Sequence, residues 1–378
     1  MPLLLSPEQE LIKQVVREFA EKELAAEATR IDRESRFPKD HYARMAPLGL
    51  LGMFLPAEEG GAGTDTLSFA VAVEEVARVS GTDAALLVLQ NAMVTYLLHR
   101  LASPEQRKAF LVPSMAGQRI GGLALTEEAG GSSLRDILTT ATPSPSGFLL
   151  QGSKAFVSLA GAADYYLVLA QIPGVGPSFF LVPRDADGLH FSPAESKLGL
   201  RGLPLAEMYL NRVAVEPEAL LGRIGTAWEA LEEPLLLARL GVAAGLIGLT
   251  QAALEMSVAF SRTRVQFGQP IIRYGAIRGF IADLQADLDA ARATAYGAAA
   301  LRDAHKEYEE EVYEARLLAH RIAVRGTRIA HKIHGGAGFM RDLPLERVSR
   351  DVRTFMHLWG GHDITRSRLA DHLLGPAT

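Results

Sequence analysis

The sequence contains no cysteine, which excludes disulfide bonds, thiolate metal sites and cysteine nucleophiles together. This absence fits a reducing compartment, and we predict a cytoplasmic location. Lysine is scarce too, since only 8 of the 39 basic residues are lysines. The net charge of −5 favours solubility and argues against a nucleic-acid partner or an anionic membrane surface.

Long apolar runs are also lacking. No stretch of the sequence approaches the roughly 20 uninterrupted apolar residues of a membrane span, so we predict none. The segment Met1–Pro7 has no basic region and too short an apolar run for a secretory signal peptide. At 378 residues the chain exceeds the roughly 250–300 at which single cores stop growing, so two or three domains are expected.

Helical patterns occupy the first part of the chain. Ser6 before Pro7, with Gln9 at the third helical position, predicts the start of a helix. Helical spacing of apolar residues continues through residues 68–79 and 84–101. This part of the chain is therefore predicted to be helical.

From about Gly121 the chain carries short apolar runs, such as 165–169 and 179–182, bounded by proline and glycine. They predict the strands of a small antiparallel sheet. Long helical patterns return from about Thr226. We therefore predict an α+β multidomain protein with a helical domain at residues 1–120, a central antiparallel β-domain at 121–225 and a helical domain at 226–378.

Two segments near the strands carry residues suited to a cofactor. Residues 125–133 read Leu-Thr-Glu-Glu-Ala-Gly-Gly-Ser-Ser, where glycine amides and serine hydroxyls can approach an anion or a cofactor edge. At strand spacing, Phe156 and Ser158 share one face, one to stack and one to donate a hydrogen bond. Taken alone, such segments are more often a glycine loop and a half-buried strand.

Two further segments lie among the later helices. Arg264 ends a long helix beside Phe267, and its planar guanidinium suits a pyrophosphate. Residues 332–339 read Lys-Ile-His-Gly-Gly-Ala-Gly-Phe, a cluster that lets the backbone approach a ligand. A surface salt bridge and a helix cap with its turn are the ordinary explanations of these segments taken alone.

The order and spacing of the four segments together resemble the acyl-CoA dehydrogenase family over essentially the whole chain. Supporting matches are Lys197–Gly202, Arg239 ahead of Val242–Gly245, and Glu346–Arg347 with Arg350–Asp351. The resemblance implies an N-terminal helical domain, a central β-domain and a C-terminal four-helix bundle, with FAD between the last two. It also implies an acyl-CoA or related acyl thioester as substrate and electron-transferring flavoprotein as the usual electron acceptor.

The resemblance further implies which residues hold the ligands. The flavin and its pyrophosphate would be lined by Leu125, Thr126, Gly131, Ser132, Phe156, Val157 and Ser158. A neighbouring subunit would reach the cofactor with Arg264, Gln266, Phe267, Lys332, Gly335 and Gly336. The substrate would contact Ser132, Arg239, Gly360 and Gly361. A cofactor site shared in this way requires at least a dimer, and the family is most often a homotetramer.

The catalytic base that the resemblance implies is missing. The family carries an aromatic-Glu-Gly-Thr stretch, whose glutamate removes the substrate α-proton, where this chain has Trp359–His362 with Gly360 in the glutamate position. Some members place the glutamate one residue before the substrate arginine, and here that residue is Ala238. Glycine and alanine cannot take a proton, so both base positions are empty.

Asp363 is the candidate replacement, because the segment is about one residue short and could bring this carboxylate to the α-carbon. The alternative is that Asp363 caps the next helix, with Arg366 as its partner. We predict an FAD-dependent acyl-CoA dehydrogenase-like oxidoreductase of fatty acid metabolism with a relocated base and no metal. The alternatives are a flavin oxidase or monooxygenase, in which His362 could serve a flavin hydroperoxide, and a non-catalytic flavin- or acyl-CoA-binding subunit, such as one of a hetero-oligomer.

Overall fold

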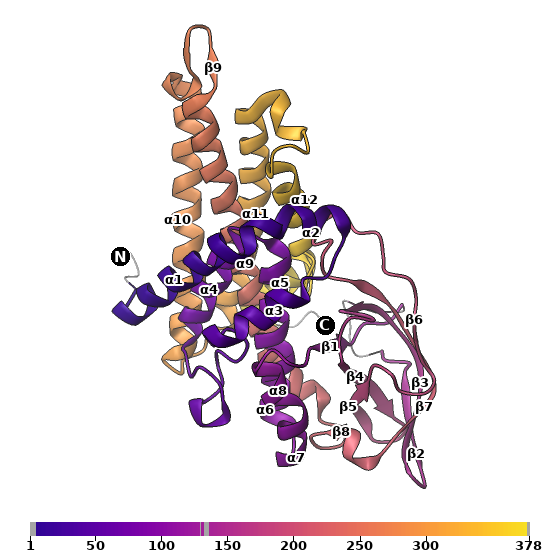
Figure 1. The fold of residues 1–378 in the computed structure, drawn as a ribbon. Helices are drawn as coiled ribbons and strands as arrows, with labels where there is room; N and C mark the ends of the chain where they lie inside the picture. Colours follow the sequence, from indigo (N-terminus) through magenta and orange to yellow (C-terminus); the bar gives the residue numbers. More distant parts are fainter. Residues whose placement is uncertain (1–4, 129, 132–135, 376–378) are drawn as a thin grey trace.

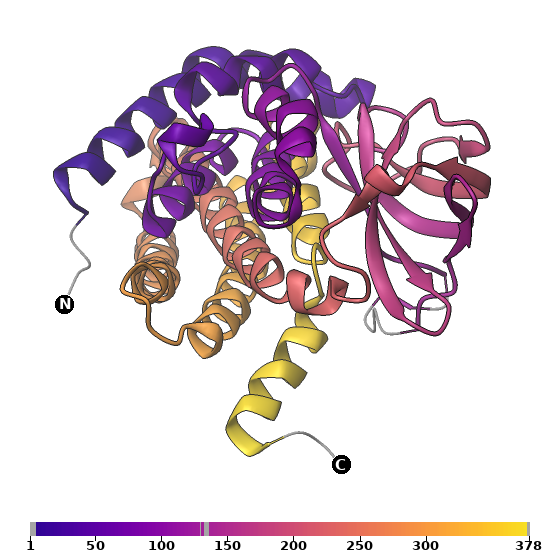
Figure 2. The same cartoon turned by 90° about the horizontal axis from the view of Figure 1, so that it is seen from below.

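The computed structural model describes residues 5–128, 130–131 and 136–375. Helices come first in the chain, a sheet lies in the middle, and long helices follow (Figure 1). This order confirms the predicted fold class. Seen from below, the sheet lies at one side of the molecule and the orange C-terminal helices at the other (Figure 2).

The first helix begins where the sequence predicts. Ser6 Oγ accepts a hydrogen bond from the Gln9 amide at 3.2 Å, and the Gln9 side chain accepts one from the Ser6 amide at 2.9 Å. This reciprocal pair satisfies amides that a helix start leaves free. The helices of this region are α1 (Pro7–Phe19), α2 (Ala25–Glu34), α3 (Lys39–Met45), α4 (Thr66–Ala77), α5 (Gly81–Val88), α6 (Tyr96–Leu101), α7 (Pro104–Gln106) and α8 (Val112–Met115), with π-helical turns at Ala20–Leu24, Leu89–Thr95 and Arg107–Leu111.

Eight strands form the main sheet, in the order β6-β7-β3-β1-β4-β5-β8, with β2 beside β3 and β4. The sequence predicts an antiparallel sheet, but the main sheet is not wholly antiparallel. The β2–β3 hairpin separates β1 from β4 in the sequence, and these two strands pair in parallel. The strands are β1 (Gly121–Ala124), β2 (Thr140–Ser144), β3 (Gly147–Ser158), β4 (Tyr165–Ile172), β5 (Gly176–Pro183), β6 (Leu189–Phe191), β7 (Leu205–Val215) and β8 (Leu220–Leu221).

The C-terminal region consists of long helices and one small hairpin. Its elements are α9 (Ala227–Thr263), the hairpin of β9 (Val265–Gln266) and β10 (Gln269–Pro270), α10 (Gly275–Asp303), α11 (Glu309–His334), α12 (Leu345–Phe355) and α13 (His362–Leu374). Short 3₁₀ turns lie at Ala46–Leu48, Ala57–Glu59, Pro217–Ala219, Ile271–Arg273 and Gly335–Phe339. In Figure 2 the yellow α13 reaches away from the body of the molecule.

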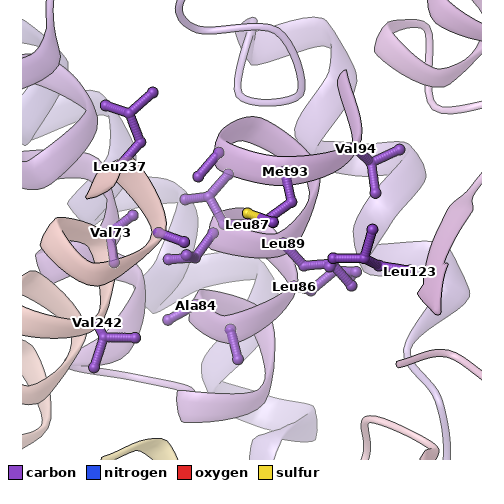
Figure 3. Packing of buried hydrophobic residues seen from close by; sticks show 14 of the residues in the cluster. Val73, Ala84, Leu86, Leu87, Leu89, Met93, Val94, Leu123, Leu237 and Val242 are labelled. Atoms are coloured by element: carbon purple, nitrogen blue, oxygen red, sulfur yellow. The ribbon is translucent and has the colours of Figure 1, made fainter. Parts of the chain in front are cut away.

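Helices α4 and α9 pack closely in the core. A Cβ at Gly248 would lie 2.2 Å from the carbonyl oxygen of Glu74, so this glycine allows the two helices to approach. Leucine, valine, alanine and methionine side chains fill the surrounding space (Figure 3). The stretches Gly81–Leu101 and Ala227–Thr263 are long and apolar enough to cross a membrane, which the sequence prediction did not single out. Their most apolar windows are 83% and 78% buried inside the protein, as in core helices.

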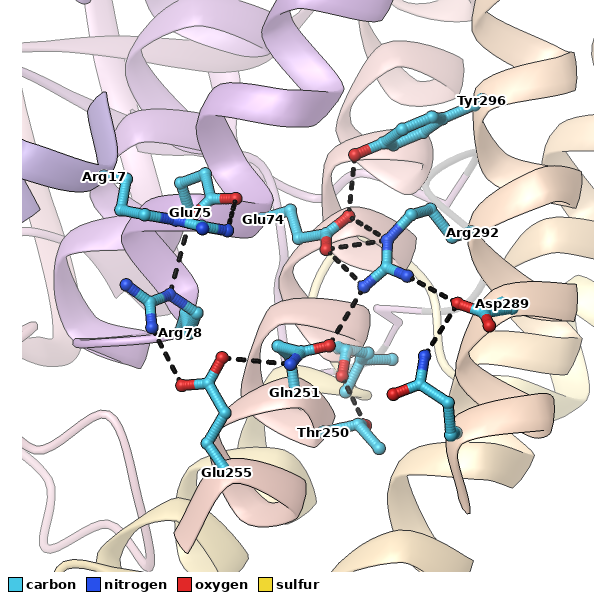
Figure 4. Close-up of polar contacts among 12 residues, drawn as sticks. Arg17, Glu74, Glu75, Arg78, Thr250, Gln251, Glu255, Asp289, Arg292 and Tyr296 are labelled. Carbon is cyan, nitrogen blue, oxygen red and sulfur yellow. Dashed lines mark hydrogen bonds and ion pairs between the residues drawn. The ribbon is translucent and has the colours of Figure 1, made fainter. Parts of the chain in front are cut away.

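A polar network joins α4 to α10 beside this core (Figure 4). Arg292 donates to Glu74 Oε1 through Nε at 2.9 Å and Nη2 at 2.8 Å, and the Tyr296 hydroxyl donates to Glu74 Oε2 at 2.9 Å. Arg292 also donates to Asp289 at 3.0 Å. Burial disfavours the charged guanidinium, but Glu74 outweighs burial and the pKa of Arg292 is raised. This half-buried cation is therefore matched by carboxylates.

Candidate active site

The segment 358–361 joins α12 to α13, and its backbone is constrained. Trp359 has a φ of +50° and Gly360 a φ of +97°, a conformation that favours glycine. A Cβ at Gly360 would lie 3.7 Å from Arg239 Nη2 and 3.7 Å from Ile364 Cγ2. The position of a side chain at residue 360 therefore has room for a Cβ in van der Waals contact with a guanidinium, and a side chain there would strain the backbone.

Arg239, predicted to contact substrate, extends from α9 to this segment. Its Nε donates to the carbonyl oxygen of Trp359 at 3.3 Å, and its Nη1 donates to the Tyr313 hydroxyl at 3.3 Å. The guanidinium also lies 5.5 Å from the centre of the Tyr313 ring, within the range of a cation–π contact. Burial lowers the pKa of Arg239. Within the described residues, Nη2 makes no hydrogen bond, so it is free to bind a ligand.

Arg316 on α11 is a site residue that the sequence analysis missed. Its side chain is almost completely buried, and Nη2 donates to the carbonyl oxygens of Met356 at 3.4 Å and Leu358 at 2.5 Å, and to that of Gly360. Its Nη1 is buried and has no hydrogen-bond partner in the part of the chain that the structure describes. Burial and the neighbouring Arg239 lower the pKa of Arg316 to about 9. The arginine therefore fixes the segment by its carbonyls and keeps donor capacity unused.

A second missed residue, His320, pairs with His362 at the start of α13. The two Nδ1 atoms lie 2.6 Å apart, so one ring must donate and the other accept. Burial and His362 lower the pKa of His320 to about 4, and burial lowers the pKa of His362. Both rings are therefore neutral at pH 7. The spacing of Tyr313, Arg316 and His320, three and four residues apart on one helix, was the signal that could have found them.

Asp363, the candidate base, lies in the first turn of α13. Its side chain is 92% exposed, and Oδ1 lies 3.7 Å from Arg366 Nη1. The alternative of a helix cap is wrong in its detail, because Gly361 is the N-cap residue and no side chain caps the helix there. The expected Arg366 contact is present. An exposed carboxylate lacks the desolvation that usually raises the pKa of a catalytic base.

The sheet brings together several residues predicted to line the flavin. Ala155 donates from its amide to the carbonyl oxygen of Thr126 at 2.8 Å, and a Cβ at Gly131 would lie 3.0 Å from Thr126 Cγ2. One extra residue in β3 relative to β7 makes a bulge at Phe156, whose φ is +53° and whose ring is 64% exposed. The other predicted residues nearby are Leu125 and Val157, both buried, and Ser158, half-buried. Ser132 lies outside the described residues.

A separate cavity of about 610 Å³ gathers most of the residues assigned to the neighbouring subunit's cofactor. Its lining includes Arg264, Gln266, Phe267, Gly335 and Gly336, from two segments far apart in the sequence. Phe267 is 95% exposed.

Lys332 is not part of that lining. Its ammonium lies 5.5 Å from the centre of the Phe280 ring on α10. Figure 1 places the β9 hairpin far from the main sheet, so the residues predicted to hold FAD form two separate groups in one chain. A cofactor site shared between subunits would have this arrangement.

Three family models match successive parts of this chain. They describe the N-terminal domain of acyl-CoA dehydrogenase at residues 6–119, its middle domain at 122–213 and its C-terminal domain at 225–374. The short-chain specific acyl-CoA dehydrogenase of Bos taurus mitochondria is 33% identical over 97% of this chain and 90% of its own.

Solved structures agree with these matches. Butyryl-CoA dehydrogenase from Megasphaera elsdenii superposes with a TM-score of 0.94 at 29% identity, covering 99% of this chain and 100% of its own. A chain from a study of the electron transferring flavoprotein of Acidaminococcus fermentans gives a TM-score of 0.95 at 31% identity, with coverage of 99% and 100%.

The chain belongs to the acyl-CoA dehydrogenase family. The predictions of this family, of FAD as cofactor and of an oxidoreductase acting on the CH–CH group of an acyl-CoA are confirmed.

Proposed function

We propose that this protein removes two hydrogens from the α- and β-carbons of a short-chain acyl-CoA. The observation that carries the proposal is the placement of Arg239 and Arg316, which hold the segment 358–361 by its carbonyl oxygens. The segment is thereby fixed beside the substrate arginine although residue 360 has no side chain. Relatives named for short-chain and butyryl substrates support a short acyl group.

The described residues fit FAD. The cavity near the β9 hairpin offers the Arg264 guanidinium for a phosphate. No atom of the described residues lies within 4 Å of a Cβ at Gly335 or Gly336, so the backbone there can meet a ligand. The exposed ring of Phe156 can stack on a flavin. Bound FAD supplies the hydride acceptor. The substrate and cofactor contacts that the sequence predicts, including those of Ser132, Gly360 and Gly361, are part of this proposal.

The proton step is the part of the reaction that this chain must perform differently. The Gly360 amide can still donate to the thioester oxygen, which makes the α-proton easier to remove. Asp363 is the base proposed from the sequence, but its 92% exposure places it in water in the single chain. His362, which follows the segment 358–361, is another titratable group at this place, and its lowered pKa keeps it neutral and able to accept a proton at pH 7.

The assembly, partner and location are also proposals. The two separate groups of predicted FAD residues support at least a dimer, and we propose a homotetramer. The oxidised acceptor is electron-transferring flavoprotein, and the location is the cytoplasm, supported by the absence of cysteine. Domain boundaries are proposed near residues 120 and 225.

A second candidate is a flavin- and acyl-CoA-binding subunit without turnover. Gly360 offers no carboxylate, and Ala238, at the other base position, is completely buried in α9. Such a subunit would bind acyl-CoA and leave it unchanged.

Product analysis tests the proposal. The FAD-loaded protein is incubated with saturated short-chain acyl-CoAs and an electron-accepting dye, and the thioesters are examined by mass spectrometry. We expect a product with two hydrogens fewer. The variant Arg239→Met should lose most of the activity, while Arg353→Met, at an exposed position of α12, should retain it. Unchanged thioesters with bound FAD would favour the non-catalytic candidate.

A further inference from the structure

Two neighbouring arginines beside Gly360, the buried Arg316 and the half-buried Arg239, form no ion pair with a carboxylate of the described residues. Among the described residues, the hydrogen bonds of Arg239 and Arg316 go to backbone carbonyl oxygens and to one tyrosine hydroxyl. Glu309 acts on Arg239 with the opposite charge, but its carboxylate accepts a hydrogen bond from the Tyr313 hydroxyl at 2.5 Å and forms no ion pair with Arg239. Positive charge therefore accumulates at this place.

The surroundings increase that charge. Arg368 on α13 lowers the pKa of Arg239, and Arg239 lowers the pKa of Arg316, as neighbouring charges of the same sign do. A buried cation without an opposite charge costs several kcal/mol, because its hydration is lost and nothing replaces it. Such an arrangement persists most readily where a ligand supplies the missing charge.

The unpartnered nitrogens of the two arginines lie near Gly360, where a side chain is missing. Arg239 Nη2 has no partner among the described residues and lies 3.7 Å from the position of a Cβ on Gly360. Arg316 Nη1 is buried and unpartnered within the same part of the chain, and its other nitrogen holds the Gly360 carbonyl oxygen. A carboxylate bound beside Gly360 could accept a charge-assisted hydrogen bond from Arg239 Nη2.

We propose that Arg239 binds a carboxylate carried by the acyl group of the substrate, beside Gly360, with Arg316 as the positioning residue behind it. This inference rests on the proposed function and narrows its substrate to acidic acyl thioesters. The carboxylate replaces water on Arg239 and offsets the charge of both arginines. Neutral acyl groups of equal length leave the two cations unmatched.

Binding of matched ligands tests this inference. Malonyl-, succinyl- and glutaryl-CoA are compared with propionyl-, butyryl- and pentanoyl-CoA on the FAD-loaded protein, by anaerobic titration calorimetry. We expect at least one acidic ligand to bind about tenfold more tightly than its neutral counterpart, the size of one charge-assisted hydrogen bond. Equal affinities in all three pairs would overturn the inference and leave the proposed function standing. Absence of binding by all six would overturn both.

Two substitutions assign the preference to these arginines. Arg239→Met should abolish the preference for acidic ligands. Arg316→Met should reduce the ratio of acidic to neutral affinity, whereas a purely structural role would weaken the binding of both kinds of ligand alike. If the preference survives Arg239→Met, the carboxylate binds elsewhere and the inference fails.

Gly360→Asp and Gly360→Asn form a pair matched in shape and in backbone strain. Only the aspartate can supply an internal carboxylate to Arg239, so we expect it to show the higher Tm and to lose the preference for acidic ligands. The asparagine variant should keep that preference. An asparagine variant as stable as the aspartate variant would show that the arginines need no anion.

Discussion

The half-buried Arg292 and the buried Arg316 lie in different settings in this molecule, and their partners differ. Arg292 lies among Glu74, Asp289 and Tyr296 in the helical core, and its pKa is raised (Figure 4). Arg316 lies among carbonyl oxygens, and its pKa is lowered to about 9 by burial and by another arginine. Both side chains are immobilised by several hydrogen bonds.

This difference in partners indicates that Arg292 stabilises the fold, whereas Arg316 and Arg239 serve ligand binding. Around Arg292, the carboxylates compensate the desolvation of the guanidinium, so the network can hold α4 to α10 by itself. Around Arg316 and Arg239, no carboxylate of the described residues forms an ion pair, and Glu309 acts on Arg239 only from a distance. We therefore propose that a ligand binds at Arg239 and Arg316, and that the reaction takes place there.

The largest expected effect is in the first setting. Glu74→Gln leaves Arg292 without its buried partner, and we expect the free energy of unfolding to fall by about 3 kcal/mol. Chemical denaturation measures it. Asp289→Asn is the matched control, since that carboxyl is 60% exposed and its loss should cost less than about 0.5 kcal/mol. Equal effects would mean that burial does not decide the strength of these pairs.

Arg316→Met should destabilise the protein less, by about 1 kcal/mol. The hydrogen bonds to three carbonyl oxygens are lost, but removal of an unmatched buried charge offsets part of that loss. Unfolding in denaturant again gives the value. A loss of stability as large as that of Glu74→Gln would show that Arg316, like Arg292, chiefly stabilises the fold, and would contradict the difference between the two arginines.

The histidine pair adds a pH dependence to the second setting. The folded pKa of His320 is about 4, below its usual value of 6.5, under the influence of burial, His362, His357 and Arg316, with Asp363 opposing. Stability from this group is present above pH 6.5 and is lost as the pH falls through the folded pKa of about 4. His320→Gln should flatten the fall by about 1 kcal/mol, allowing for solvent screening. An unchanged pH profile of unfolding would contradict this assignment.

Asp363→Asn should have the smallest effect on stability, below about 0.5 kcal/mol, because its contact with Arg366 is exposed. Its effect on flavin reduction decides its role as a base. We expect a small change in rate in view of its exposure. A loss of about 100-fold or more would establish Asp363 as the general base, as the sequence proposes.

The sequence predicted the fold well because the relevant signals are local. Ser6 and Gln9 cap α1, and the short apolar runs at 165–169 and 179–182 lie in β4 and β5. The parallel pairing of β1 with β4 was missed, since strand direction depends on the whole topology.

The candidate site was only half predictable. Arg239 and Gly360 stood in segments with a recognisable order, and in the structure a Cβ added to Gly360 would lie 3.7 Å from Arg239 Nη2. Arg316 and His320 lie on a helix with ordinary amphipathic spacing, and only the packing of α11 against the segment before α13 gives them a role. The exposure of Asp363 likewise depends on the residue at which α13 begins. The sequence predicted a helix start near Asp363 but not the exact residue.

Anaerobic titration of the FAD-loaded protein with short acyl-CoAs, acidic and neutral, tests the central claim most directly. The account predicts that the visible flavin absorbance is bleached although residue 360 is glycine, and that acidic ligands act at lower concentration. A flavin that stays oxidised while every acyl-CoA binds would contradict it and show that the protein holds these ligands without reacting.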